Sequence, residues 1–420
     1  MIRSNTKFSA LDNWLPLFLV FFPSVMVLIP IFHETAYRRA VHFTPLLPLL
    51  FQGFIVAYAL LTGTLKDRKP TRISLFVLVP AAVLLAIIVY STTWVATLKS
   101  YSVLKLLEIF LFILTAYFSG LLFERGGKRL RRYTTVAIFA SVLLALPISA
   151  ILFSLKLPAS FKWPEFMPGF TYVRIYGFSL TISIAAGIGL LMQPDLKRPL
   201  VRLAILSGLS ILWATLFWTG GRGGLVSLLV TVPILAVLIP GMRAALIPAA
   251  IALIIGGAVS SFLPVPNPTF GIFNVYKDVV QVETLENFGG GRIHLWKATL
   301  ALIAEHPWFG SGYAQLLTFR DQTGIGQLHT HNIVLEAALA WGWVGAVCSG
   351  FLVARLWILG LFRTSVSDFA ERIPAFLVVT SMLVFALVDG VYIYYQSLIP
   401  TALCVGILLA NPVGKVFAKS

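Results

Sequence analysis

The segment HTHNIVLEAALAWGWVG, residues 329–345, sets two histidines directly before a long apolar run. The chain has only six histidines, so two of them one residue apart stand out. The apolar run continues to about residue 360. As a helix it is long enough to cross the hydrocarbon core of a bilayer, which takes about 20 residues. We therefore expect His329 and His331 at the mouth of a membrane-spanning helix.

Apolar runs of this length recur along nearly the whole chain. Of the 420 residues, 58% are hydrophobic and 11% are charged, and the mean hydropathy is +0.90. A soluble domain carries about 25% charged residues. The composition therefore predicts an all-α polytopic membrane protein with about twelve transmembrane helices. The expected spans are residues 14–30, 43–62, 73–91, 103–123, 133–154, 174–192, 201–218, 224–240, 243–263, 332–360, 372–389 and 391–410.

One long polar interval divides the chain. Residues 264–330 are too polar to span, and they separate nine expected transmembrane helices in residues 1–263 from three in residues 331–420. Most of the 32 lysines and arginines fall in loops on the side of the two termini. By the positive-inside rule, both termini are expected in the cytoplasm and the 264–330 loop in the periplasm. The first apolar run has no cleavage site behind it and is expected to be a retained helix.

The net charge and the cysteine content indicate which binding partners and which kinds of site to expect. The net charge of +16 fits either nucleic-acid binding or loops that contact anionic lipid heads, and the loop positions favour the lipid explanation. Cys348 and Cys404 both lie in apolar runs, so we expect neither a disulfide framework nor a thiolate metal site.

The polar interval contains one segment with the period of a helix, residues 291–312. Ile293, Trp296, Leu300 and Ile303 share a stripe on its surface, and the dipeptide at 306–307, which ends in proline, stops it. The pattern predicts an amphipathic helix that lies at the membrane surface.

Two arginines expected on the outer face share one local sequence. TGGRGGLVSLL (219–229) places Arg222 between glycine pairs, and FGGGRIHLW (288–296) places Arg292 after three glycines. Glycines before a helix leave backbone N–H groups for an anion, and a guanidinium adds a bidentate fork. Two such units favour a diphosphate site. Taken singly, each unit is also explained by glycines that punctuate helices and arginines that reach lipid heads.

The histidine pair favours metal-free acid–base chemistry. A metal site needs three or four ligands, and Glu336 lies about 140° round an ideal helix from His331. No two of the 16 acidic residues stand within two positions of each other, as a Mg²⁺ or Mn²⁺ site tends to need. We expect no metal and no cofactor, with His331 as the general base for a hydroxyl. A hydrogen bond at the membrane interface is the alternative role for this histidine.

Four further residues are secondary candidates. Arg174, in TYVRIYGFSL (171–180), stands at the entrance to the expected sixth span. Asp389, in LVDGVYIYYQ (387–396), lies at the outer turn between the last two spans, where it could orient an imidazole. His329 and Asn332 flank the proposed base.

These residues coincide with motifs of the O-antigen ligase and polymerase superfamily. HNIVLEAALAWGWVG (331–345) resembles its signature H-N-x-x-L followed by Gly-x-x-Gly, and GRIHLWKATLALIAEHPWFGSG (291–312) is similar to its outer-loop motif. GGRGG resembles its Ser-Arg-Gly turn, with Gly221 in place of serine, and RIYGF (174–178) resembles its Arg-x-x-Gly-aromatic element. Ala340 replaces a glutamate of many relatives. The resemblance covers the second half of the chain; the first half matches only as apolar helices.

The resemblance implies a periplasmic glycosyltransferase of the GT-C type in the bacterial inner membrane. It implies an inverting, metal-independent O-antigen ligase of lipopolysaccharide biosynthesis, which moves glycan from undecaprenyl diphosphate to lipid A–core. His331 would serve the acceptor, and Arg222 and Arg292 would hold the diphosphate. The expected partners are this lipid-linked donor, lipid A–core and membrane lipids, and no nucleic acid.

Three alternatives stay open at this point. An O-antigen polymerase uses the same donor with a lipid-diphosphate-linked acceptor. A protein O-oligosaccharyltransferase can carry a His-x-His-Asn element like residues 329–332. A transporter or flippase of lipid-linked sugar belongs to another class, and it usually binds its substrate near the bilayer midplane.

Overall fold

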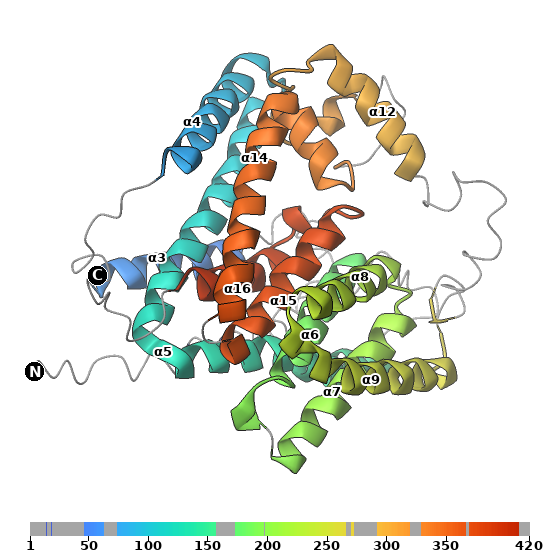
Figure 1. Ribbon diagram of the computed structural model, residues 1–420. Coiled ribbons are helices and arrows are strands. Elements are labelled where there is room, and N and C mark those ends of the chain that lie inside the picture. Colours follow the sequence, from blue (N-terminus) through green and yellow to red (C-terminus); the bar gives the residue numbers. More distant parts are fainter. Residues whose placement is uncertain are drawn as a thin grey trace, which may run out of the picture.

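The computed structural model describes Trp14, Phe18 and residues 46–62, 74–156, 173–196, 198–265, 270–272, 292–319, 329–366 and 369–410. The α-helices in these residues are α3 (Leu46–Leu61), α4 (Leu75–Tyr90), α5 (Lys99–Lys156), α6 (Val173–Leu190), α7 (Pro199–Trp218), α8 (Arg222–Leu238), α9 (Arg243–Phe262), α12 (Arg292–Glu305), α14 (Ile333–Val366), α15 (Phe369–Ala386) and α16 (Tyr395–Leu409). Short π or 3₁₀ turns are η2 (Ser91–Val95), η3 (Pro194–Leu196), η4 (Pro240–Met242), η5 (Leu316–Phe319) and η6 (Val391–Ile393). Figure 1 shows their arrangement.

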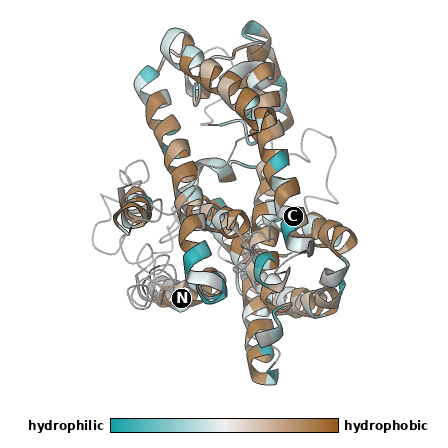
Figure 2. Ribbon diagram, turned by 60° about the vertical axis from the view of Figure 1, so that its left-hand side comes forward, coloured by the Kyte–Doolittle hydropathy of each residue, from teal (hydrophilic) through white to brown (hydrophobic). Residues whose placement is uncertain are grey.

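The helices have the length and surface of membrane spans. Among the described residues, six helices are long and apolar enough to cross a membrane, and three further apolar helices have 10–17 residues. Hydrophobic residues run along most of the helices (Figure 2), and many large apolar side chains face outward. Such a surface is stable only against lipid. The chain is a multi-pass membrane protein.

Most expected spans coincide with helices to within a few residues, from the one at 43–62, which is α3, to the one at 391–410, which is α16. The expected first span, 14–30, lies outside the described residues apart from Trp14 and Phe18, which are helical. The total of twelve spans therefore stays a prediction.

One expected loop is helical. The spans at 103–123 and 133–154 and the basic segment 125–132 between them form α5, which consists of two helices joined by a kink. The backbone leaves helical geometry at Gly127 (φ 65°, ψ −155°), and Figure 1 shows that α5 bends. Arginine, lysine and leucine are good helix formers, and only glycine adopts positive φ without strain. The basic segment therefore continues the helix on both sides of one break.

A second break divides the span expected at 332–360. α14 is interrupted at Gly342 (φ 65°, ψ 178°), which leaves a short helix before the break and a long one after it. The residues just before α14 therefore adjoin the short first part of this helix. The break at Gly342 lets this part run in a different direction from the long second part.

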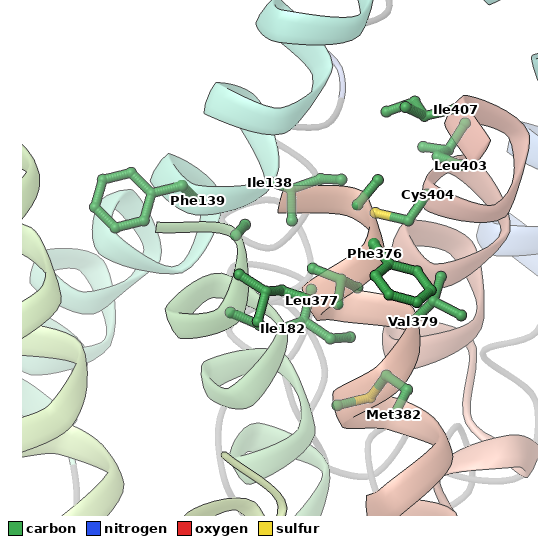
Figure 3. Packing of buried hydrophobic residues seen from close by; sticks show 14 of the residues in the cluster. Ile138, Phe139, Ile182, Phe376, Leu377, Val379, Met382, Leu403, Cys404 and Ile407 are labelled. Carbon is green, nitrogen blue, oxygen red and sulfur yellow. The ribbon is translucent and has the colours of Figure 1, made fainter. Parts of the chain in front are cut away.

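The centre of the bundle is formed by α6 and α15. Every residue of α6 from Ile175 to Leu190 is buried, as expected for a helix that is apolar on all sides. A Cβ on Gly189 would lie 2.3 Å from the Cα of Pro374, so only glycine permits this approach of α6 to α15. Figure 3 shows side chains of α5, α6, α15 and α16 interdigitating in this core.

The amphipathic helix forms as α12 and ends just before His306, as the sequence predicts, but its buried face follows the expected stripe only in part. Ile303 of that stripe is buried and Trp296 packs against the same cluster, whereas Leu300 is exposed. Leu295 and Leu302, outside the stripe, are buried. The buried face packs against α14. Apolar residues occupy so many positions of this helix that several stripes fit the pattern, and the contact with α14 selects one.

Candidate active site

His331 stands in a turn with an unusual backbone. Its φ angle is 55°, in the left-handed region that residues with side chains disfavour. Asn332 caps the following helix, because its Oδ1 accepts hydrogen bonds from Val334 N (2.9 Å) and Leu335 N (3.0 Å). Its side-chain nitrogen donates to Leu387 O at 2.9 Å, just beyond α15. The start of α14 is thereby joined to the end of α15.

Asp389, in the turn after α15, links the imidazole to an arginine. Its Oδ1 lies 2.8 Å from His331 Nδ1 and accepts the N–H of Gly390 at 2.8 Å, and its Oδ2 lies 3.1 Å from Arg292 Nη2. Burial raises the pKa of Asp389. The hydrogen bond to His331 and the charges of His331, Arg292 and Arg174 outweigh burial and hold this pKa well below its usual range. Asp389 is therefore ionised.

The ionised carboxylate determines which imidazole nitrogen is basic. A carboxylate only accepts hydrogen bonds, so Nδ1 of His331 carries the hydrogen and donates to Asp389. In the neutral ring, Nε2 then holds the lone pair and is the atom that can take a proton. The His331 and Asp389 side chains are 7% and 6% exposed, so water competes little for their hydrogen bond. The pair has the geometry of a base and its orienting acid.

His329 is a second imidazole in contact with the first. Its Nδ1 accepts the backbone N–H of His331 at 3.2 Å, and the two ring centroids are 4.1 Å apart. Its ring packs on Gly390, where a Cβ would lie 2.2 Å from the ring. Burial lowers the pKa of His329 to about 3, and the charges of His331, Arg174 and Arg292 add to this effect. His329 is thus a neutral, fixed ring.

Three arginines stand near this group, each in the first turn of a helix: Arg174 in α6, Arg222 in α8 and Arg292 in α12. Burial lowers the pKa of Arg292; Asp389 opposes this, whereas the charges of Arg174 and Arg222 add to it. Arg174 and Arg222 are exposed, and the side chain of Arg292 is 27% exposed. Helix N-termini add partial positive charge to the same place. The arrangement favours an anion.

The glycines around Arg222 have a different role from the one expected. The N–H groups of Gly221 and Arg222 donate to carbonyls of their own turn, at 3.1 and 2.8 Å, so they do not face a ligand. A Cβ on Gly223 would lie 2.4 Å from the ring of Phe385, so this glycine lets α8 pack on α15. The glycines before Arg292 lie outside the described residues.

Glu336 and Trp296 were not assigned to the site from the sequence. Glu336 was expected to point away from His331, and its Oε2 indeed makes no contact with the imidazole but accepts the backbone N–H of Thr330 at 2.9 Å. The helical angle behind that expectation does not apply, because His331 lies outside the helix. Trp296 Nε1 donates to Thr330 O at 3.0 Å. An acidic residue in the first turn of a helix was the one available signal.

The two longest motifs of the resemblance pack against each other. Residues 307–312, which follow α12, lie over the break in α14, where Trp343 N donates to Pro307 O at 2.8 Å. A Cβ on Gly342 would lie 2.1 Å from the backbone of Trp308. The signature glycine therefore serves both the positive φ of the break and this contact.

The structure thus gathers the residues expected from the sequence at one end of the bundle. Hydrogen bonds connect His329, His331, Asp389 and Arg292, while Asn332 caps α14. Arg174 and Arg222 act on this group through their charge. Within the described ranges, no three His, Cys, Asp or Glu side chains are placed to hold a metal ion.

These features define a multi-pass helical membrane protein with a buried histidine–aspartate pair beside three arginines. An O-antigen ligase family model matches residues 207–350. That range includes Arg222, Arg292 and His331 but not Asp389. The chain is also 29% identical, over 194 residues, to an O-antigen ligase of Pseudomonas aeruginosa. The aligned part is 46% of this chain and spans 40% of the length of that relative. These findings support an O-antigen ligase-like protein.

Proposed function

We propose that this chain is an O-antigen ligase, an inverting and metal-independent glycosyltransferase. It transfers O-antigen glycan from undecaprenyl diphosphate to a hydroxyl of lipid A–core. The observation that carries the proposal is the hydrogen-bonded series His331–Asp389–Arg292, with contacts of 2.8 and 3.1 Å. One carboxylate thereby fixes a base and an anion-binding group side by side.

The reaction is a single displacement. Nε2 of His331 takes the proton of the acceptor hydroxyl while that oxygen bonds to the anomeric carbon of the donor. The bond from this carbon to the diphosphate oxygen breaks, and undecaprenyl diphosphate leaves with the electron pair. Asp389 holds the ring in position and stabilises the imidazolium that forms. Attack on the face opposite the leaving group inverts the anomeric carbon.

The charges near the base suit a diphosphate leaving group. Three guanidinium groups concentrate positive charge beside the proposed base, and a doubly esterified diphosphate is an anion that such a cluster binds. The contact with Asp389 uses one of the three nitrogens of Arg292. Phosphate oxygens would be held by the remaining nitrogens of Arg292 and by Arg222, with Arg174 as a third cation. Stabilisation of the developing charge by arginines replaces the divalent cation of metal-dependent transferases.

The proposed location is the bacterial inner membrane, with both termini in the cytoplasm and the site facing the periplasm. The distribution of Lys and Arg between the expected loops supports this orientation. We divide the chain into transmembrane helices in residues 1–263, a periplasmic loop in residues 264–330 and transmembrane helices in residues 331–420.

A reconstituted transfer assay tests the proposal. Purified protein receives undecaprenyl-diphosphate glycan with or without lipid A–core, and the products are separated by size. We expect a product that requires lipid A–core and that falls at least about a hundredfold in His331→Ala and Asp389→Asn. Arg292→Lys should also be poor, since an ammonium cannot reproduce a bidentate fork.

Each other outcome contradicts a stated part of the proposal. Lengthening of the donor glycan without lipid A–core would identify a polymerase, and transfer to protein would identify an oligosaccharyltransferase. Absence of any covalent product would favour transport. Full activity of His331→Ala would remove the assigned base. Activity that disappears with EDTA and returns with Mg²⁺ would contradict the metal-independent reaction.

A further inference from the structure

The turn that carries His331 is held by side chains that take no part in the reaction described above. Both peptide groups that flank Thr330 are engaged. The N–H of Thr330 donates to Glu336 at 2.9 Å, its carbonyl accepts from Trp296 Nε1 at 3.0 Å, and the N–H of His331 donates to His329 Nδ1 at 3.2 Å. The Thr330 hydroxyl closes the turn by donating to Asn332 O at 2.8 Å.

These contacts oppose a conformational preference of the chain. A residue with a side chain disfavours φ near 55°, and without external contacts the turn would relax toward the usual regions. The direction of the His331 ring depends on this backbone angle, because the ring must meet Asp389 at 2.8 Å. A displacement of about 1 Å at a reacting group costs about a hundredfold in rate.

Glu336 is deeply buried. It belongs to the first turn of α14, it is 4% exposed, and its contact with Thr330 runs to a backbone N–H and not to the imidazole. Trp296, in α12, donates a hydrogen bond to the carbonyl of the same residue, and α12 is the helix that begins with Arg292. Thr330 therefore lies between the helix that follows the proposed base and the helix of a proposed phosphate-binding arginine.

We propose that Glu336 is a positioning residue that acts on transfer through the backbone of Thr330, as a hydrogen-bond acceptor that fixes the conformation of His331. The inference rests on the proposed function, since it assigns a supporting group to the proposed base. Trp296 is its counterpart on the carbonyl side. The role requires an acceptor oxygen at this place and does not require an ionisable group.

Two substitutions of similar size separate this role from proton transfer. Glu336→Gln keeps an acceptor oxygen and removes ionisation, whereas Glu336→Met removes both. In the transfer assay with full-length protein, we expect Glu336→Gln to retain kcat within about threefold. Glu336→Met should lower kcat by tenfold or more and leave KM for the donor unchanged, because the arginines are untouched. Trp296→Phe, which removes only the N–H donor, should lower kcat in the same way by a smaller factor.

The outcomes are distinct. Equal loss of kcat in Glu336→Gln and Glu336→Met would show that the carboxylate itself is needed and would overturn the inference, as would full activity of Glu336→Met. Thermal unfolding in detergent checks that each variant is folded. If Glu336→Met does not fold, unchanged kcat in Trp296→Phe would overturn the proposed role of the contacts to Thr330. Unaltered protein and His331→Ala are measured in the same assay. If the unaltered protein gives no product, or if His331→Ala gives product, the proposed function itself is refuted and not this inference alone.

Discussion

The two ends of α15 both carry charged residues, but the residues are engaged differently. At its first turn, Glu371 pairs with Lys128 (3.0 Å) and Arg131 (3.3 Å). The neighbouring Arg372 is fully buried and donates to Ala410 O at 2.7 Å, at the end of α16. These arginines are occupied by a carboxylate and by helix-terminal carbonyls that need donors in an apolar environment.

At the other end of α15, one carboxylate serves several cations. Asp389 contacts His331 and Arg292, and the exposed Arg174 and Arg222 contribute charge to the same place. Three guanidinium groups lie around this carboxylate, and two of them are exposed, whereas the first turn of α15 uses its arginines within the fold. The difference indicates that exposed guanidinium groups beside the proposed base distinguish a candidate anion site from a structural arginine cluster.

The largest effect is expected from an arginine at the Asp389 end. Arg222→Ala should lower transfer by about a hundredfold to a thousandfold, as loss of one donor to developing charge does elsewhere. The unfolding temperature should stay the same because Arg222 is exposed. The matched control is Arg202→Ala, an exposed arginine of α7, which should keep full activity. A stable Arg222→Ala protein with unaltered activity would break the comparison.

Two glycines of α14 test whether the break in this helix contributes to stability. Gly342→Ala places a Cβ 2.1 Å from the Trp308 backbone and forces positive φ on alanine, so we expect a loss of about 3 kcal/mol or more in unfolding free energy. Gly350→Ala is the control, since nothing lies within 4 Å of its Cβ, and a stabilisation of about 0.5–1 kcal/mol is expected. Denaturation in detergent measures the unfolding free energy of both variants. Equal changes in the two would contradict a stabilising role for the break at Gly342.

Substitutions in the first turn of α15 should change the stability of the protein and not its activity. Arg372→Met removes charged donors from the end of α16 and should lower the unfolding free energy by about 2 kcal/mol. The activity of the folded fraction should be unchanged. Arg355→Met, at an exposed position of α14, serves as the control. Loss of activity without loss of stability in Arg372→Met would show that both ends take part in the reaction.

The smallest effect concerns pH. Burial lowers the pKa of His329 from 6.5 to about 3, so between these values the unfolded chain binds a proton that the folded protein does not. Stability therefore rises with pH through this window, and acidification from pH 7 to pH 5 costs at most roughly 2 kcal/mol from this residue. The lowered pKa of Asp389 has its effect only below about pH 4, where a free aspartate titrates.

The variant His329→Asn isolates the contribution of His329 to this pH dependence. The Oδ1 of the asparagine can replace Nδ1 as acceptor for His331 N–H, but the amide does not titrate. The variant should therefore lose less stability on acidification. Thermal unfolding between pH 7.5 and pH 5 measures the difference. His294→Asn, at an exposed position of α12, should behave as the unaltered protein does. The same pH dependence in all three proteins would refute the assignment.

Much of this arrangement could be predicted from the sequence for definite reasons. Helix positions followed from the lengths of the apolar runs, because a bilayer requires them. Arg222, Arg292, His331 and Asp389 stood out because charge is scarce in such a chain. The contact of Glu336 with Thr330 was missed because His331, with a φ of 55°, breaks the helical periodicity from which the position of Glu336 was predicted. The buried face of α12 and the breaks at Gly127 and Gly342 depend on contacts with distant residues, which local patterns do not contain.

The position of Asp389 after α15 has a consequence for biosynthesis. Chains are made and folded from the N-terminus, so Arg174, Arg222, Arg292 and His331 all emerge before this aspartate. An insertion intermediate without α15 holds the charges of Arg174, Arg222 and Arg292 without Asp389, and repulsion between like charges disfavours their approach. Arrival of α15 fills the centre of the bundle and brings the negative charge of Asp389 in the same step. The proposed base therefore acquires its partner only when this late helix has been inserted.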